Sequence, residues 1–205
     1  VVRILAAEFP EYPFSLKALF TDRQREVLYR LLQSSVSKAE AAYRRVYEEN
    51  SPVTRFLVAQ ALPLPRAFML AAEFVINNDL RIEFDAEDID IAHARALVNE
   101  AAALKVPLDK EGLAFALKRT LERLAQRLAT DPDDVRALDA LARSATLARS
   151  LPISVDLWKV QNSYYQLLQS DYESHSARAA EGSADAAHWV DLFTVVGRQL
   201  DVAVP

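Results

Sequence analysis

Apolar side chains recur at steps of three and four residues along most of this chain. The pattern is clearest where leucines occupy a single stripe, at positions 113, 117, 121, 124 and 128. That spacing places side chains on one face of an α-helix, and no segment alternates with the two-residue period of a strand. Only three glycines occur, which leaves few tight turns. The pattern predicts an all-α fold: a helical bundle of about seven to eight mostly antiparallel helices.

Prolines and capping residues predict where the first helices begin and end. Thr21 and Gln24 form a capping box, so the first long helix is expected to begin at Thr21 and to end near Glu49. Ser51 followed by Pro52 predicts the start of a separate short helix. We therefore expect residues 1–20 to be an N-terminal tail and residues 21–205 to form a single helical domain.

Later helix starts carry the same signature, a side chain that can accept hydrogen bonds from the first N–H groups of a helix. The expected caps are Asp88 or Asp90, Asp109, Asp131 with Pro132 at the first helical position, Ser154 or Asp156, and Ser183.

Charge and composition exclude several classes of function. The net charge is −5 with both signs interspersed, which disfavours nucleic-acid binding. The absence of cysteine excludes disulfides and thiolate chemistry and fits a cytoplasmic protein. The longest weakly charged stretch, residues 56–72, contains Pro63, Pro65 and Arg66, so it is a poor membrane span.

Residues that could carry catalysis are scattered. No two of the histidines at positions 93, 175 and 188 have the spacing of a metal motif, and paired acids such as Asp133-Asp134 lie at expected helix ends. We therefore predict no catalytic residue, no metal and no cofactor. An independent enzyme would need acids and imidazoles that converge in a cleft.

The most distinctive segment runs from residue 156 to residue 172. One helical stripe there holds Trp158, Asn162, Tyr165, Gln169 and Tyr172, and Leu157, Gln161, Tyr164 and Leu168 fall beside it. Aromatic faces next to amides suit sugars, and they equally suit a core helix whose polar tips find buried partners. We favour the core interpretation and keep five residues as candidate sugar-binding positions: Trp158, Gln161, Asn162, Tyr165 and Gln169.

The same segment carries a family resemblance. The stretch Asp156-Leu157-Trp158-Lys159-Val160-Gln161-Asn162-Ser163-Tyr164-Tyr165 is similar to part of a known family, as are residues 15–21, 24–28, 67–75 and 121–125. Together they resemble the C-terminal helical domain of uncharacterised function found in glycoside hydrolase family 57-like proteins, of the α-amylase or α-mannosidase-like kind. The resemblance implies that the catalytic carboxylates belong to a preceding hydrolase-like domain of the same polypeptide. It implies no catalytic residue within this chain.

These observations lead to two expectations of function. The first is a non-catalytic accessory domain that packs on, and helps to wall, the glycan cleft of the preceding catalytic domain, with an α-glucan as the ligand. The alternative is a protein-interaction or homodimerisation module unrelated to carbohydrate, for which the long first helix offers a surface. Neither expectation involves nucleic acid or a membrane.

Overall fold

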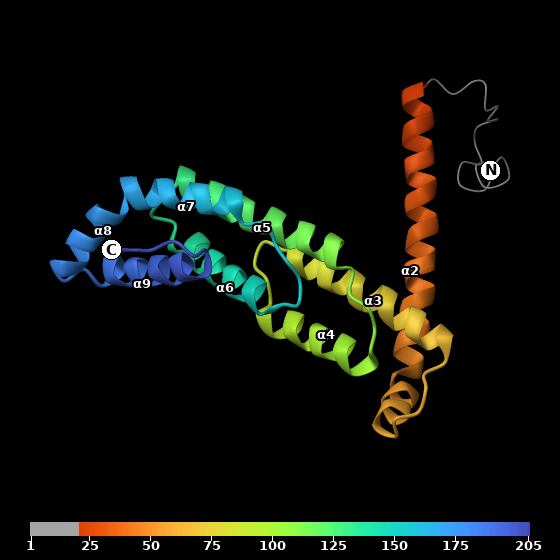
Figure 1. Cartoon of the computed structure of the whole chain (residues 1–205). Coiled ribbons are helices and arrows are strands. Elements are labelled where there is room, and N and C mark those ends of the chain that lie inside the picture. Colours follow the sequence, from red (N-terminus) through yellow and green to blue (C-terminus); the bar gives the residue numbers. More distant parts are fainter. Residues whose placement is uncertain (1–20) are drawn as a thin grey trace. The chain divides into compact units, whose positions relative to one another are not determined.

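The computed structural model describes residues 21–205, and helices joined by loops, without a strand, make up this part of the chain (Figure 1). The all-α prediction is confirmed. The eight helices of the described residues are α2 (Thr21–Ala59), α3 (Arg66–Asp85), α4 (Ile91–Leu104), α5 (Lys110–Thr130), α6 (Val135–Ser150), α7 (Trp158–Ser170), α8 (Tyr172–Ala180) and α9 (Ala184–Gln199). None of these helices combines the length and the apolar character that crossing a membrane requires. The N-terminal tail expected for residues 1–20 lies outside the described residues.

The chain divides into two compact units, and the boundary falls between Val75 and Ile76, within α3. The expectation of a single domain over residues 21–205 stays a prediction.

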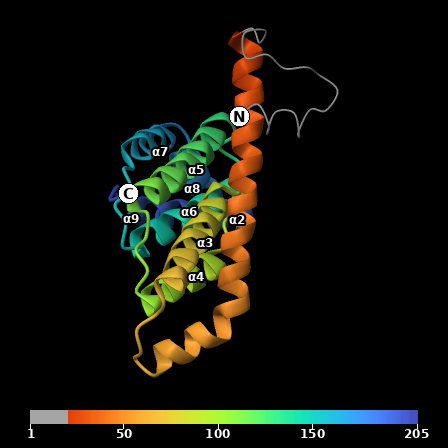
Figure 2. The ribbon, with the colours of Figure 1, turned by 90° about the vertical axis from the view of Figure 1, so that its right-hand side faces the viewer.

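Helix α2 dominates the first unit. It continues through Pro52, so the expected break between Glu49 and Ser51 is wrong. A proline removes one backbone N–H donor, and a helix tolerates this loss with a bend. Figure 2 shows the C-terminal part of α2 turning away from the direction of its long first part. In the same unit Tyr43 of α2 stacks on Phe74 of α3, with ring centroids 4.8 Å apart.

The second unit is a bundle in which α6 packs against both α5 and α9. Helix α7 packs on α5, and α8 connects α7 to α9 (Figure 1). Fully buried side chains of three helices meet in the core: Leu117 and Leu121 of α5, Leu138 and Leu141 of α6, and Phe193 of α9. The bundle therefore fixes α5 and α7 as neighbours, and their outer faces carry the candidate site.

Three of the expected caps are confirmed. Asp90, Asp109 and Ser183 each accept a hydrogen bond from a backbone N–H in the first turn of the helix that follows. The cap expected at Asp131 for α6 is wrong, because α6 begins three residues later and Asp134 caps it. Asp134 also accepts a 2.6 Å hydrogen bond from Arg127 Nε of α5, so a tertiary contact selects the cap.

Candidate functional site

A charged pair fixes the start of α7. The carboxylate of Asp156 accepts hydrogen bonds from Lys118 Nζ of α5 at 2.6 Å and from the Trp158 backbone N–H at 3.2 Å. These bonds, that from Lys118 first, lower the pKa of Asp156, and the same pairing raises the pKa of Lys118. The first turn of α7, including Trp158, is thereby tied to α5.

The buried face of α7 consists of Val160, Tyr164 and Leu167. Tyr164 stacks on Phe193 with centroids 4.2 Å apart, and its hydroxyl donates to the Phe193 carbonyl at 2.8 Å. Burial raises the pKa of this phenol. Tyr164 is thus a core residue, as the favoured interpretation of the segment had it.

The stripe next to this face is exposed. Trp158 is 65% exposed and Tyr165 is 52% exposed, and the amides of Asn162 and Gln169 also face solvent. The core interpretation is therefore wrong for these four residues. Successive helical residues differ by about 100° in direction, so Tyr164 and Tyr165 cannot both face the core.

Gln161 and Tyr172 differ from the rest of the segment. Gln161 is half-buried, and its Nε2 donates to the Leu200 carbonyl at 2.8 Å, which joins α7 to the end of α9. Tyr172 lies in α8, beyond the end of α7, and its ring is tilted against that of Phe193. The exposed α7 stripe, by which we mean Trp158, Asn162, Tyr165 and Gln169, thus excludes Gln161.

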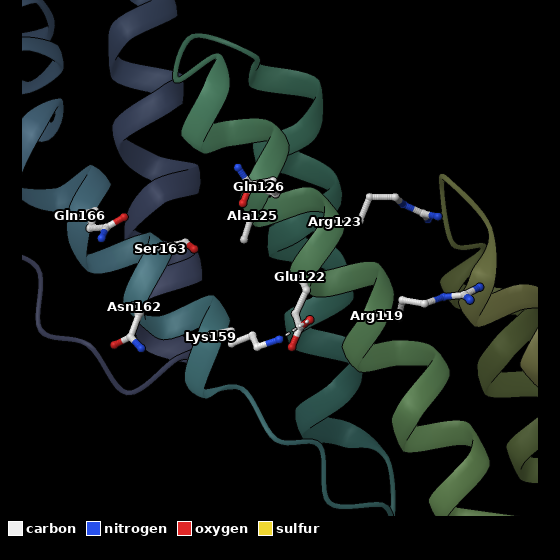
Figure 3. Close-up of a pocket in the computed structure, with 9 residues that line it drawn as sticks. All are labelled: Arg119, Glu122, Arg123, Ala125, Gln126, Lys159, Asn162, Ser163 and Gln166. Carbon is white, nitrogen blue, oxygen red and sulfur yellow. Dashed lines mark ion pairs between the residues drawn. The ribbon is translucent and has the colours of Figure 1, made fainter.

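A polar groove of about 520 Å³ runs beside this stripe, between α5 and α7 (Figure 3). Asn162 belongs to both the stripe and the groove. The other side chains that line the groove are Arg119, Glu122, Arg123, Ala125 and Gln126 of α5 and Lys159, Ser163 and Gln166 of α7.

Glu122 is the one carboxylate that lines the groove. Its Oε2 lies 3.6 Å from Lys159 Nζ and its Oε1 lies 3.8 Å from Lys118 Nζ. Oε1 is buried, and no described residue gives it a hydrogen bond. Figure 3 shows Lys159 directed toward Glu122, whereas Arg119 and Arg123 turn away from α7. Arg119 pairs with Asp85 at 2.8 Å, and Arg123 donates to the Ala86 carbonyl at 2.8 Å.

The groove and the stripe offer amides, a hydroxyl, an ion pair and two exposed rings. Histidine is absent from the residues that line the groove, and Glu122 has no second carboxylate beside it there. Among residues 26–205, no three His, Cys, Asp or Glu side chains gather as metal ligands. The arrangement suits a neutral ligand that is rich in hydroxyl groups, because amides and charged groups can bond hydroxyls while rings stack on C–H faces.

Sequence reasoning missed a buried imidazole. His175 of α8 stacks on Trp189 of α9, with centroids 3.9 Å apart, and its Nε2 lies 2.9 Å from Asp133 Oδ1. Its Nδ1 lies 2.9 Å from the Asp171 carbonyl. Asp171 precedes His175 by four residues, so the helical period could have indicated this contact. Asp133 is far from His175 in the sequence, and no local pattern indicates that contact. His93 and His188 are exposed.

Comparison of the chain with known protein families, with characterised proteins and with solved structures finds no match.

Proposed function

We propose that this chain is a non-catalytic accessory helical domain of a family 57-like glycoside hydrolase. In this proposal α7 contributes one wall of the glycan cleft of a preceding catalytic domain, and the ligand is an α-glucan. The observation that carries the proposal is the exposed α7 stripe, which presents two aromatic rings and two amides in one row.

Trp158 exposes 65% of its side chain, although tryptophan is highly buried on average in folded proteins. Its ring is therefore free to stack on a ligand. The two rings of the stripe are seven residues apart, so they lie about 10 Å apart along the helix axis. A chain of sugar rings laid along α7 would meet Trp158, then Asn162, then Tyr165.

The groove beside the stripe supports the same ligand. Gln126, Ser163 and Gln166 reach it from the two helices that flank it, and each offers a neutral hydrogen-bonding group. Lys159 and Glu122 pair with each other, so the charges at the centre of the groove largely compensate. Such a surface favours neutral hydroxyls over a free anion.

Calorimetric titration of the chain with α-glucan oligosaccharides tests the proposal. Trp158→Ala is expected to weaken binding about fivefold or more, since one stacked ring contributes about 1 kcal/mol or more with its buried area. Trp158→Phe keeps an aromatic face and is expected to retain most of the affinity. Phe115→Ala, at an equally exposed ring on α5, is the matched control and is expected to bind like the unaltered chain. If none of these chains binds, or if Phe115→Ala weakens binding as much as Trp158→Ala, the proposal is wrong.

The alternative function, a protein-interaction or homodimerisation module, draws on a different observation. Helix α2 exposes a row of large apolar side chains that includes Leu28, Tyr29, Leu32 and Val36. An apolar row of this length on a helix surface is typical of a contact with another protein.

A further inference from the structure

The exposed row on α2 follows a strict heptad repeat. Nine positions alternate in steps of three and four residues, and we call them the α2 seam: Tyr29, Leu32, Val36, Ala39, Tyr43, Val46, Asn50, Val53 and Leu57. All but Asn50 carry apolar or aromatic side chains. In heptad notation Tyr29 is an a position, Leu32 is a d position, and the pattern continues to Leu57.

A repeat of this kind specifies the shape of its partner. A helix that packs on a globular surface needs a broad apolar stripe with a period of 3.6 residues. The α2 seam is narrow and keeps a period of 3.5 residues over four heptads, which only another long helix wound around it can follow. Among the described residues, α2 itself is the longest helix, at 39 residues, and the next longest is α5, at 21.

The seam is accessible over its N-terminal half. Leu32 is 63% exposed and Val36 is 51% exposed, and Tyr29 is exposed to a similar degree. Phe74 of α3 contacts the seam at Tyr43. Val46 and Asn50 are half-buried, and Pro52 precedes Val53 and Leu57, so the tightest pairing is expected over residues 29–43.

We propose that α2 pairs with α2 of a second copy of this chain as a parallel, in-register, two-stranded coiled coil. The proposal does not depend on glycan binding. It identifies the occupant of the exposed row as a second α2, which alone among the described helices carries this repeat over this length.

Charge is compatible with this self-pairing. No seam position is charged, and the only charged residues that flank the seam at e and g positions are Glu40 and Glu49. In a parallel pair Glu40 faces Ser35 of the second copy. The e position opposite Glu49 is Thr54, which is buried within its own chain and carries no charge. No like charges meet across the interface, and the basic residues Arg30, Lys38 and Arg45 lie outside it.

The exposed apolar area on α2 and the position of one asparagine also favour self-pairing. The large exposed apolar side chains on and beside the seam are Leu28, Tyr29, Leu32, Val36, Tyr43, Val53 and Phe56. At about 100 Å² for each half-exposed side chain, they offer on the order of 700 Å² per copy, close to the roughly 800 Å² per partner of a stable interface. Asn50 is the single polar a position, and a lone asparagine at that position favours parallel, in-register pairs because the two amides must meet.

Light scattering on the whole chain tests the association. The chain is expected to be dimeric at micromolar concentration. Leu32→Glu places two carboxylates in the closed interface and is expected to weaken the dimer about 100-fold. Ala41→Glu adds the same charge at an f position on the opposite side of α2 and is expected to leave the dimer intact. Circular dichroism checks that both variants remain helical.

Cysteine cross-linking tests the orientation, because the chain has no cysteine of its own. Val36→Cys brings two a-position thiols within disulfide distance only in a parallel, in-register pair. Oxidised glutathione is therefore expected to join most Val36→Cys chains, and few Ala41→Cys chains. A monomeric chain, a Leu32→Glu variant that still dimerises, or equal cross-linking at positions 36 and 41 would each overturn the proposal. A dimer that Leu32→Glu disrupts but Val36→Cys does not cross-link would contradict the parallel arrangement.

Discussion

At the scale of single residues, neighbours in sequence divide between core and surface. Tyr164 is buried against Phe193 while Tyr165 and Trp158 face solvent. Composition predicted an aromatic helix but could not say which of two adjacent stripes faces inward, because both contain aromatic and amide residues. The choice depends on the position of Phe193, which is far away in sequence and reaches α7 only through the packing of α9.

One glycine on α9 permits this packing. A Cβ at Gly197 would lie 2.6 Å from the Tyr164 hydroxyl and 3.0 Å from the Val202 carbonyl oxygen. Gly197→Ala is therefore expected to destabilise the fold by about 1–3 kcal/mol, despite the better helix propensity of alanine. Urea unfolding measures the change. A variant as stable as the unaltered chain would show that α7 and α9 do not approach so closely.

The buried imidazole of His175 gives a second residue-scale prediction. His175→Ala removes the stack on Trp189 and the contact with Asp133, and it is expected to lower the free energy of unfolding by about 2–3 kcal/mol. His188→Ala, at an exposed position of α9, is the control and is expected to change it by less than about 0.5 kcal/mol. Thermal unfolding compares the two variants, and equal stabilities would contradict this placement of His175.

At the scale of elements, the period of the apolar residues and the capping side chains predicted most helices. Two helix boundaries were predicted wrongly, and each error has a physical reason. The expected break after Glu49 assumed that Ser51 and Pro52 begin a new helix, yet proline removes only one backbone hydrogen bond and α2 continues. The start of α6 depends on the bond between Asp134 and Arg127, a contact between two helices that local sequence does not reveal.

Substitution of Asp134 tests whether this residue, and not Asp131, caps α6. Its Oδ1 accepts a hydrogen bond from the Ala137 N–H at 3.0 Å, and Asp134→Ala is expected to cost about 1 kcal/mol of stability. Asp131→Ala, at the cap that the sequence favoured, is expected to change stability much less. Denaturant midpoints of the two variants decide between the positions, and a larger loss at Asp131 would restore the sequence-based cap.

The same carboxylate makes stability depend on pH. The backbone N–H of Ala137 first, and then Arg127, hold the pKa of Asp134 below its ordinary value. A lowered folded-state pKa gives a stability contribution that is present above the unfolded value of about 3.9 and is lost as the pH falls through the folded value. The stability advantage of the unaltered chain over Asp134→Asn should therefore shrink as the pH falls below about 4. An advantage that grows toward acid pH would contradict this direction.

At the scale of the whole molecule, two surfaces of different chemistry lie on separate compact units. The first unit presents the α2 seam, and the second presents the exposed α7 stripe beside the polar groove. The fold class followed from the spacing of apolar residues alone. The groove could not be predicted from the sequence, because its residues come from both α5 and α7. Only the packing of these two helices brings Glu122 and Lys159 together.

The central claim is that the α7 stripe contacts a glycan. The two tryptophans of the chain make a direct measurement of this contact possible. The chain has an exposed indole at Trp158 and a buried one at Trp189, whose Nε1–H donates to the Pro132 carbonyl at 2.8 Å. Nuclear magnetic resonance resolves the two indole N–H signals during titration with an α-glucan oligosaccharide. We predict that the Trp158 signal shifts progressively to saturation while the Trp189 signal stays in place. A Trp158 signal that does not move at saturating oligosaccharide would contradict the claim.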